Sequence, residues 1–356
     1  MDLNKSKVIR LGIIGCGWIM KKVHIPVFAD IPHVRISAIY DKSIEELKQF
    51  TGSLKDVRLY CDLNEFFSEK LDAVIIGTPN SLHSYYTQEA LSRGIHVLCE
   101  KPVGLSASEI KQMIEMSKRR KVIYLPAYVN RYRKDINIVY ENIRNGRIGE
   151  IRSIDAKWIR SNGIPRAGGW NTNRAMAGGG VLQDLGSHMI DLCTYFAECD
   201  IMSDCKATFA VAEHSEQKSA LWLNKANDYC DFDVETSVKA EIYLENGIQV
   251  KMYLDWAAEK EGDYTDFCIT GTKGTIRLHT LFGFSNNYPE AKRKTIVLET
   301  DESTTELDVD NVSQMEAFSR QAHYFIDCID NGDYINMNCD CAYPTVNIIE
   351  KLYKCR

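Results

Sequence analysis

The sequence contains no apolar stretch long enough to cross a membrane, no internal repeat and no low-complexity linker. A membrane-spanning helix needs about 20 consecutive apolar residues, so no membrane partner is expected. An excess of one charge is also missing, because 43 lysines and arginines stand against 49 aspartates and glutamates, giving a net charge of −6. Without a basic excess there is no electrostatic case for binding nucleic acid or an anionic membrane.

Cysteine is not scarce, but the spacings that would make it a metal site are absent. Cys339 and Cys341 form only C-x-C, with no second pair at zinc-finger spacing. The 12 cysteines are scattered, and several, such as Cys16 and Cys61, fall inside apolar elements. We therefore expect reduced structural thiols and no metal. Residues 1–5 also lack the apolar region of a signal peptide, so the expected location is cytoplasmic.

A chain of 356 residues exceeds most single hydrophobic cores, so two domains are expected. Up to about residue 128, strand-like and helix-like patterns alternate. The expected strands are 8–14, 34–40, 57–60, 72–77, 95–99 and 122–127, and the expected helices are 18–29, 43–51, 81–92 and 106–119. This order predicts a domain over 1–128 with an open, mostly parallel sheet, which binds its ligand at the C-terminal ends of the strands.

A glycine turn, Gly15-Cys16-Gly17, follows the first expected strand. Such a turn lets the backbone approach a pyrophosphate at the N-terminus of a helix beginning near Trp18, although Met20 replaces the third glycine of the dinucleotide fingerprint. Asp41 ends the second strand, where an acid accepts from an adenosine ribose. Asp41 favours NAD over NADP, and Lys42 beside it leaves NADP possible. The ordinary alternative is a plain strand-to-helix turn with Asp41 as a helix cap.

Two further strands of this expected sheet end in polar segments. Thr78-Pro79-Asn80 follows one of them, with His83 on the first turn of the next helix, and Glu100-Lys101-Pro102 follows the other. A residue before proline is restricted to an extended backbone conformation. The backbone of Lys101 is therefore rigid, which suits a lysine whose ammonium group must be held in place for catalysis. From the tripeptide alone, a surface lysine in a turn is an equal alternative.

Beyond residue 128 the pattern changes to that of a second domain, 129–356. A helix over 131–145, a strand over 150–160 and a glycine-rich passage over 161–180 precede a helix that carries His188. Alternating runs follow at 234–244, 248–256, 264–270, 275–279 and 294–299, and helices are expected at about 312–330 and 342–353. The dipeptide Asn246-Gly247 is a strong hairpin signal, so these runs predict an antiparallel sheet.

Five segments together resemble one family. They are Gly15-Cys16-Gly17, Thr78 to His83, Glu100-Lys101-Pro102, Asn130-Arg131-Tyr132 and Gly178 to His188, and they occur in the order and approximate spacing of the glucose-fructose oxidoreductase / inositol dehydrogenase / rhizopine catabolism (Gfo/Idh/MocA) family. The resemblance covers nearly the whole chain. It implies an N-terminal Rossmann dinucleotide-binding domain and a C-terminal α/β domain whose open, mainly antiparallel sheet often makes dimer or tetramer contacts.

The resemblance also implies NAD(P)-linked oxidation or reduction of a secondary alcohol in a sugar, sugar phosphate or cyclitol such as inositol. Oxidation removes the hydroxyl proton while a hydride moves to the nicotinamide, and a neutral imidazole is the best base near pH 7. His188 is the candidate base, with Asp184 one helical turn before it. Lys101 would donate to the reacting oxygen, or would itself be the base after its pKa is lowered. Asp191, three residues beyond His188, is expected to have a structural or orienting role.

The fingerprint and the resemblance together assign two sets of binding residues. The cofactor set is Gly15, Cys16, Gly17, Trp18, Ile19, Asp41, Lys42, Thr78, Pro79, Asn80, His83, Glu100, Lys101, Asn130 and Trp170. The substrate set is Lys101, Arg131, Tyr132, Arg160, Trp170, Asp184 and His188. Arg160, Arg166 and Arg174 lie in or beside the glycine-rich passage: if several face the pocket, a phosphorylated or carboxylated sugar is expected, and otherwise a neutral one.

Two other functions remain possible from the sequence. A related fold can keep the cofactor and lose the reaction, as in a sensor protein, although the joint presence of Lys101, Asp184 and His188 argues against this. A third possibility is an enzyme that holds NAD tightly and uses it in an oxidation and re-reduction cycle. Copurifying cofactor without net NADH formation would distinguish that enzyme from a simple dehydrogenase.

Overall fold

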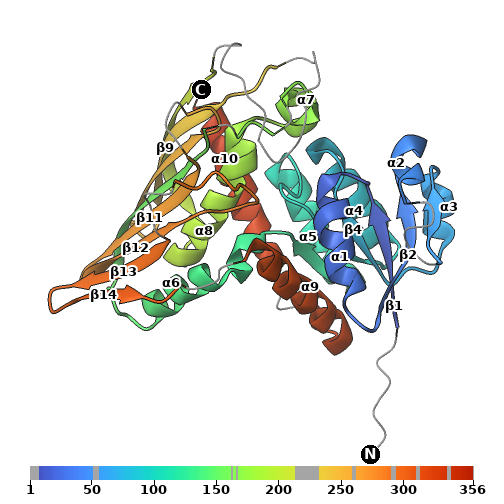
Figure 1. Cartoon of the computed structure of the whole chain (residues 1–356), viewed down its shortest axis with the longest axis horizontal. Helices are drawn as coiled ribbons and strands as arrows, with labels where there is room; N and C mark the ends of the chain where they lie inside the picture. Colours follow the sequence, from blue (N-terminus) through green and yellow to red (C-terminus); the bar gives the residue numbers. More distant parts are fainter. Residues whose placement is uncertain are drawn as a thin grey trace, which may run out of the picture. The chain divides into compact units, whose positions relative to one another are not determined.

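The structure is a computed structural model, and it describes residues 8–50, 56–161, 163–165, 167–212, 232–258, 262–289, 294–309, 313–334 and 338–355. Arg166, one of the arginines discussed above, lies outside these ranges. The chain forms two compact units: unit 1 is Met1–Val129 with Phe318–Ala342, and unit 2 is Asn130–Ala317 with Tyr343–Arg356. Figure 1 labels the elements of both.

Unit 1 contains a six-stranded sheet in which all neighbouring strands run parallel. The strands are β1 (Ile9–Ile14), β2 (Val34–Tyr40), β3 (Arg58–Tyr60), β4 (Ala73–Ile76), β5 (His96–Cys99) and β6 (Tyr124–Pro126), in the order β3-β2-β1-β4-β5-β6. This is the strand order of a doubly wound dinucleotide-binding sheet. The chain adds strands toward one edge from β1 to β3 and toward the other edge from β4 to β6, so the switch point lies between β1 and β4. The parallel sheet predicted from the sequence is therefore confirmed.

The helices of unit 1 connect these strands. They are η1 (Met20–His24), α1 (Ile25–Ala29), α2 (Ile44–Lys48), α3 (Leu63–Ser68), η2 (Asn80–Leu82), α4 (His83–Ser92) and α5 (Ala107–Arg120), followed late in the chain by α9 (Gln314–Asn331) and η8 (Asn338–Cys341). A reciprocal capping box between Ser106 and Glu109 begins α5. Most of α9 belongs to this unit, where the Phe318 ring meets His24 edge-on at 5.4 Å.

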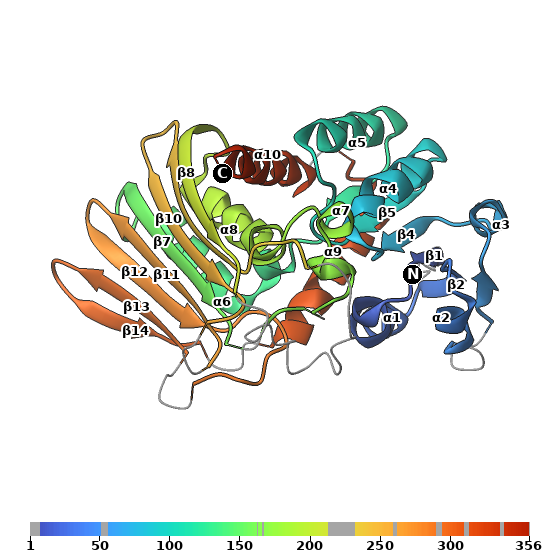
Figure 2. The same ribbon diagram turned by 90° about the horizontal axis from the view of Figure 1, so that it is seen from above.

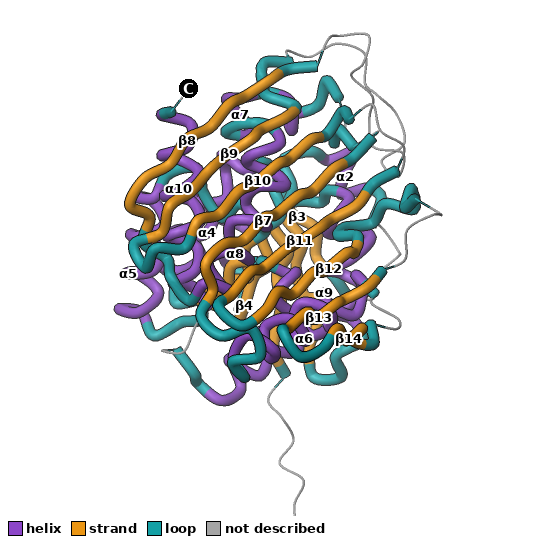
Figure 3. Tube along the Cα trace, turned by 90° about the vertical axis from the view of Figure 1, so that its left-hand side faces the viewer, coloured by secondary structure: helices purple, strands orange, loops and turns teal. Residues whose placement is uncertain are grey.

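Unit 2 contains an eight-stranded sheet in the order β14-β13-β12-β11-β7-β10-β9-β8, which Figure 3 shows nearly face-on. The strands are β7 (Ile151–Ile159), β8 (Met202–Ala210), β9 (Ser237–Leu244), β10 (Gln249–Asp255), β11 (Tyr264–Gly271), β12 (Gly274–Thr280), β13 (Thr295–Thr300) and β14 (Thr304–Leu307). Neighbours are antiparallel except β7 and β10, which are parallel. The mainly antiparallel sheet is thus confirmed, and β9 and β10 form the predicted hairpin, in which Gly247 has φ +85°.

Figure 2 shows α6, α8 and α10 on one face of the large sheet. The helical segments of unit 2 are η3 (Val129–Tyr132, which begins in unit 1), α6 (Lys134–Arg144), η4 (Trp170–Thr172), α7 (Arg174–Ala177), η5 (Leu182–Gly186), α8 (Ser187–Ala197) and α10 (Ala342–Lys354). Burial alternates along β9, where Val238, Ala240 and Ile242 face the core. In the described part of the chain, no helix is both long and apolar enough to span a membrane.

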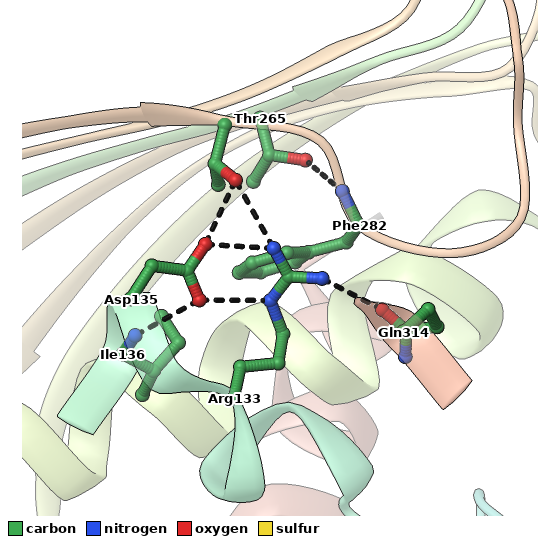
Figure 4. A network of polar contacts seen from close by, with 7 residues as sticks. Arg133, Asp135, Ile136, Thr265, Phe282 and Gln314 are labelled. Carbon is green, nitrogen blue, oxygen red and sulfur yellow. Dashed lines mark hydrogen bonds and ion pairs between the residues drawn. The ribbon is translucent and has the colours of Figure 1, made fainter. Parts of the chain in front are cut away.

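A buried ion pair fixes the start of α6 (Figure 4). Arg133 and Asp135, both about 1% exposed at their side chains, form a bidentate pair at 3.0 and 2.7 Å. Thr280 on β12 bonds to both partners, and Gln314 accepts from Arg133 at 2.7 Å. The guanidinium also lies 4.7 Å from the centre of the Phe282 ring. This network links η3, α6, the large sheet and the first turn of α9.

Candidate active site

The glycine turn follows β1 as predicted. Gly15 has φ +93°, and a Cβ there would lie 2.8 Å from the carbonyl oxygen of Gly77. Its amide donates to the Tyr40 carbonyl at 2.8 Å, which fixes the turn at the end of β2. Only glycine combines this left-handed backbone with so close an approach, so the turn has the bare backbone that a pyrophosphate requires.

Asp41 lies directly against the glycine turn. One carboxylate oxygen accepts from the Cys16 amide at 2.7 Å, and the other accepts from the Ser43 amide at 2.9 Å. Burial raises the pKa of the Cys16 thiol, and the negative charge of Asp41 raises it further, so the thiol stays neutral. The carboxylate is therefore fixed next to the turn, and its remaining lone pairs suit ribose hydroxyls.

Met20 stands where the dinucleotide fingerprint has its third glycine, and it is fully buried. A Cβ on Gly77 would lie only 2.2 Å from the Met20 methyl group. The close packing of helix on strand is thus achieved by a glycine at the end of β4, because the methionine fills the space that a side chain at position 77 would need. The sequence showed that the third glycine is absent, but it did not indicate that Gly77 makes the close approach instead.

His83 connects the two polar segments at the ends of β4 and β5. Its Nδ1 lies 2.7 Å from the Pro102 carbonyl oxygen, and its Nε2 lies 2.8 Å from the Thr78 carbonyl oxygen. The ring is 1% exposed, and burial lowers the pKa of His83 below its ordinary value. Both nitrogens are therefore engaged within the protein, which makes His83 a brace between the segments that carry Asn80 and Lys101.

Glu100 and His24 form a buried pair behind Lys101. The Glu100 Oε1 lies 2.6 Å from His24 Nε2, and its Oε2 accepts from the Lys101 amide at 3.1 Å. Burial acts to raise the pKa of Glu100, but the His24 hydrogen bond and the nearby positive charges hold that pKa below its ordinary value. His24 thus fixes the carboxylate that holds the Lys101 backbone. The Lys101–Pro102 peptide bond is cis.

In unit 2, Asp184 and His188 lie on one continuous helical run, η5 followed by α8. His188 is 8% exposed, and its ring centre lies 5.8 Å from that of Trp158 on β7. The Trp256 indole N–H donates to Asp184 at 3.3 Å. The sequence spacing correctly predicted a shared helix, whereas the contact between Trp256 and Asp184 had no signal in the sequence.

Arg160 joins this group from the end of β7. Its guanidinium carbon lies 4.9 Å from the centre of the Trp158 ring, and the residue is 6% exposed. Burial lowers the pKa of Arg160, while the charges of Asp184 and Asp263 act to raise it. Arg160 is therefore a buried cation that lies against an indole and is influenced by the charges of two carboxylates, in the same unit as Asp184 and His188.

The other arginines expected near substrate also lie against carboxylates. Arg131 donates to both oxygens of Asp191 at 2.8 Å, and it stacks 4.6 Å from the Tyr195 ring centre. Arg174 Nη2 lies 3.7 Å from Oε2 of the buried Glu235. Asp191 is 1% exposed and accepts both of these Arg131 bonds, and its structural or orienting role beside His188 stays a prediction.

The remaining expected site residues divide between the two units. The glycine turn, Asp41, Lys42, the segment from Thr78 to His83, Glu100 and Lys101 belong to unit 1, and Asn130, Arg131, Tyr132, Arg160, Trp170, Asp184 and His188 belong to unit 2. Asn130 is buried, while Lys101, Tyr132 and Trp170 are half-buried. One expectation about cysteine is wrong: Cys61 follows β3 and is exposed rather than packed in an apolar element.

Comparison with known proteins identifies the chain. The family model "Oxidoreductase family, NAD-binding Rossmann fold" of GFO_IDH_MocA matches residues 9–128, and the model of the GFO/IDH/MocA C-terminal domain matches residues 137–277. The chain belongs to the Gfo/Idh/MocA family. This member is accordingly an oxidoreductase with an NAD-binding domain.

Three named relatives are 26–27% identical to this chain over the aligned residues. A candidate UDP-kanosamine synthase oxidoreductase subunit of Amycolatopsis mediterranei (strain S699) is 26% identical over 352 residues, 97% of this chain and 95% of that protein. D-glucoside 3-dehydrogenase of Escherichia coli (strain K12) is 27% identical over 68% of each chain. Glucose-6-phosphate 3-dehydrogenase of Bacillus subtilis (strain 168) is 27% identical over 55% of each.

Solved structures share the fold over nearly the whole chain. Levoglucosan dehydrogenase in complex with NADH and levoglucosan has a TM-score of 0.79 at 19% identity, covering 98% of this chain and 96% of that one. KijD10, a 3-ketoreductase from Actinomadura kijaniata in complex with NADP and TDP-benzene, has a TM-score of 0.78 at 18% identity, covering 97% of each chain. At these identities the likeness establishes the fold.

Proposed function

We propose that the protein transfers a hydride between NAD and a secondary alcohol of an uncharged sugar ring. The observation that supports this most is the group formed by Asp184, His188 and Trp158 in unit 2. It combines a base, an acid that accepts from hydroxyls, and an aromatic ring suited to the apolar face of a sugar. Such a group is what a polyol oxidoreductase needs beside a bound nicotinamide.

The cofactor residues would act as follows. The glycine turn would hold the pyrophosphate, and Asp41 would accept from the adenosine ribose. Bound NAD would supply the nicotinamide as hydride acceptor. Because both Asp41 oxygens already receive backbone amides, the carboxylate cannot swing away from a 2′-phosphate without losing them, so NAD is preferred over NADP. The other proposed cofactor contacts are Trp18, Ile19, Lys42, Thr78, Pro79, Asn80, Glu100, Asn130 and Trp170. His83 would serve the cofactor by bracing the segments that carry Asn80 and Lys101.

In the oxidation direction, His188 would take the proton from the reacting hydroxyl as the carbinol hydride leaves. Asp184 would accept from a neighbouring hydroxyl and favour the imidazolium that forms. Lys101, with its backbone held by Glu100, would donate to the reacting oxygen and stabilise its developing negative charge. The alternative assignment exchanges two roles, so that Lys101 is the base and His188 orients the substrate.

The charge balance of unit 2 favours a neutral substrate ring. Arg131 lies against Asp191, Arg174 lies near Glu235, and Arg160 experiences the charges of Asp184 and Asp263. An arginine that binds a phosphate or carboxylate has donors directed at that group, whereas Arg131 and Arg174 already lie against carboxylates of the protein. The substrate-contacting role proposed for Arg131, Tyr132, Arg160 and Trp170 is therefore one of shaping and hydrogen bonding.

The relatives suggest which carbon reacts. The D-glucoside and glucose-6-phosphate enzymes are named 3-dehydrogenases, and KijD10 is named a 3-ketoreductase. We accordingly propose oxidation at carbon 3 of a pyranoside. We further propose a cytoplasmic homo-oligomer, a dimer or tetramer. Its cofactor-binding domain would cover 1–128, and its substrate-binding and oligomerisation domain would lie within 129–356, apart from the stretch Phe318–Ala342, which belongs to unit 1.

The experiment is an NADH absorbance assay of purified protein. Methyl glucosides, free hexoses and inositols are compared with hexose 6-phosphates and hexuronates, each with NAD and with NADP. Turnover of a neutral pyranoside with NAD, and a 3-keto product identified by mass spectrometry and NMR, is expected. Preference for the phosphates would contradict the neutral-ring proposal. NAD binding without turnover of any sugar would favour a recycled, tightly held cofactor or a sensor.

A further inference from the structure

One residue receives the amide groups of Gly180, Val181 and Leu182, at the point where the helical run that carries Asp184 and His188 begins. The Glu235 side chain, 0% exposed, accepts at Oε1 from the Gly180 amide at 2.9 Å and the Leu182 amide at 3.2 Å. The Glu235 backbone carbonyl accepts from the Val181 amide at 3.1 Å. Amides at a helix start have no partner within the helix, so a distant residue here does the work of a cap.

The neighbouring residue holds Asp184 from another direction. The Thr236 carbonyl accepts from the Trp256 amide at 2.9 Å. The Trp256 indole in turn donates to Asp184 Oδ2 at 3.3 Å. Glu235 therefore holds the start of the helical run that carries Asp184. Thr236 holds the backbone of Trp256, whose indole donates to the Asp184 side chain.

Glu235 is itself fixed by Tyr353 on α10. The tyrosine hydroxyl donates to Glu235 Oε1 at 2.7 Å, and its ring stacks on Phe209 with centres 5.5 Å apart and planes at 13°. A Cβ on Gly179 would lie 1.8 Å from that hydroxyl, and a Cβ on Gly180 would lie 2.0 Å from the Glu235 carbonyl oxygen. Two glycines of the triglycine segment are thus required by this anchor, whatever the substrate is.

A buried carboxylate at a helix start has two effects. It satisfies donors that would otherwise be buried without partners, and its charge complements the positive end of the helix. Charge-assisted bonds are also short and directional, so they restrict the helix to one position. Catalytic groups are sensitive to this, because displacement of a reacting group by about 1 Å can cost on the order of a hundredfold in rate.

We infer that Glu235 is a positioning residue for Asp184 and His188, and that Tyr353 on the C-terminal helix holds Glu235 in place. This inference rests on the proposed function for its kinetic consequences, but its structural consequence can be measured without turnover. None of the relatives' names assigns a role to either residue.

The test uses two conservative variants of the full chain and one matched control variant. Glu235→Gln keeps the shape and one acceptor but removes the charge. Tyr353→Phe keeps the ring and removes one donor. Tyr243→Phe is the control, because it removes the same kind of bond, from the Tyr243 hydroxyl to Glu241 at 2.8 Å, on β9. Amide hydrogen exchange of the 180–190 segment is measured first, and steady-state kinetics with substrate deuterated at the reacting carbon follow.

Glu235→Gln and Tyr353→Phe are expected to speed exchange in segment 180–190, while Tyr243→Phe leaves it unchanged. We expect kcat to fall about tenfold in Glu235→Gln, and less in Tyr353→Phe, with the NAD dissociation constant unchanged. The deuterium isotope effect on kcat should rise, because misplaced groups slow the chemical step. A partly unfolded variant would instead lose kcat with an unchanged isotope effect.

Wild-type exchange in both variants would overturn the inference, as would a loss of kcat matched by the unfolded fraction without any rise in the isotope effect. If the wild-type enzyme turns over no sugar, the proposed function fails. The exchange measurement still decides in that case whether Glu235 and Tyr353 anchor the helix.

Discussion

The packing of Met20 on Gly77 gives the sharpest stability prediction. An added Cβ at position 77 would lie 2.2 Å from Met20 Cε, 3.2 Å from Met20 Cγ and 3.5 Å from Ile19 Cγ2. Ordinary contact between carbon atoms begins near 3.5 Å, so Gly77→Ala forces the methionine methyl group to move by more than 1 Å. Met20 is fully buried between helix and sheet, which leaves it little room to do so.

Overpacking of this kind costs about 1–3 kcal/mol. Met20→Ala alone leaves a cavity and costs about 2–5 kcal/mol. In the double variant the new alanine at 77 enters the space that the methionine has left, so the two losses should not add. We expect a favourable coupling of at least about 1 kcal/mol in the double-mutant cycle.

Urea unfolding followed by circular dichroism measures the four free energies of the cycle, and calorimetry measures NAD binding. Gly17→Ala is a matched control, because a Cβ there has its nearest neighbour at 3.8 Å. We expect Gly17→Ala to leave stability nearly unchanged and to weaken NAD binding by obstructing the pyrophosphate. An undiminished stability of Gly77→Ala, or strictly additive losses in the cycle, would refute the packing argument.

Three further predictions follow from other contacts. Asp41→Ser should weaken NAD binding and reduce the ratio of NAD affinity to NADP affinity. Titration calorimetry with both cofactors measures this ratio. Asp135→Asn should destabilise unit 2 by about 3–5 kcal/mol in chemical denaturation, because it leaves the Arg133 charge buried without its counterion. Since the folded-state pKa of Glu100 lies below its ordinary 4.5, its ionisation stabilises the fold above that pH and ceases to do so as pH falls further. The stability advantage of wild type over Glu100→Gln should therefore shrink below about pH 4.5 in urea unfolding at several pH values.

The sequence predicted the elements whose pattern is local. The buried strands of unit 1 are continuous apolar runs, and β9 to β12 alternate clearly, so both sheets could be anticipated. The sequence did not predict β8 and β14, because these edge strands are exposed at most positions and carry no run of buried apolar residues. It also missed α3, a helix of six residues whose main signal is the Asp62 cap.

The candidate site was predictable where its residues are close in sequence. The glycine turn, Asp41 and the pair Asp184 and His188 follow from spacing. Glu235 and Tyr353 could not be found in this way, because Glu235 meets the helix start from 55 residues away along the chain and Tyr353 meets Glu235 from 118 residues away. The triglycine segment is the one related feature of the sequence. It indicates that no side chain fits at these positions, but not which residues fill the space.

The central claim is that His188 and Lys101 carry out hydride-transfer chemistry on a sugar hydroxyl. The most direct measurement is single-turnover NADH formation by wild type, His188→Ala and Lys101→Ala on whichever neutral pyranoside the wild type oxidises, with NAD affinity measured in parallel. We expect both variants to bind NAD normally and to react slower by about 100-fold or more. Near-normal rates in both variants would contradict the account.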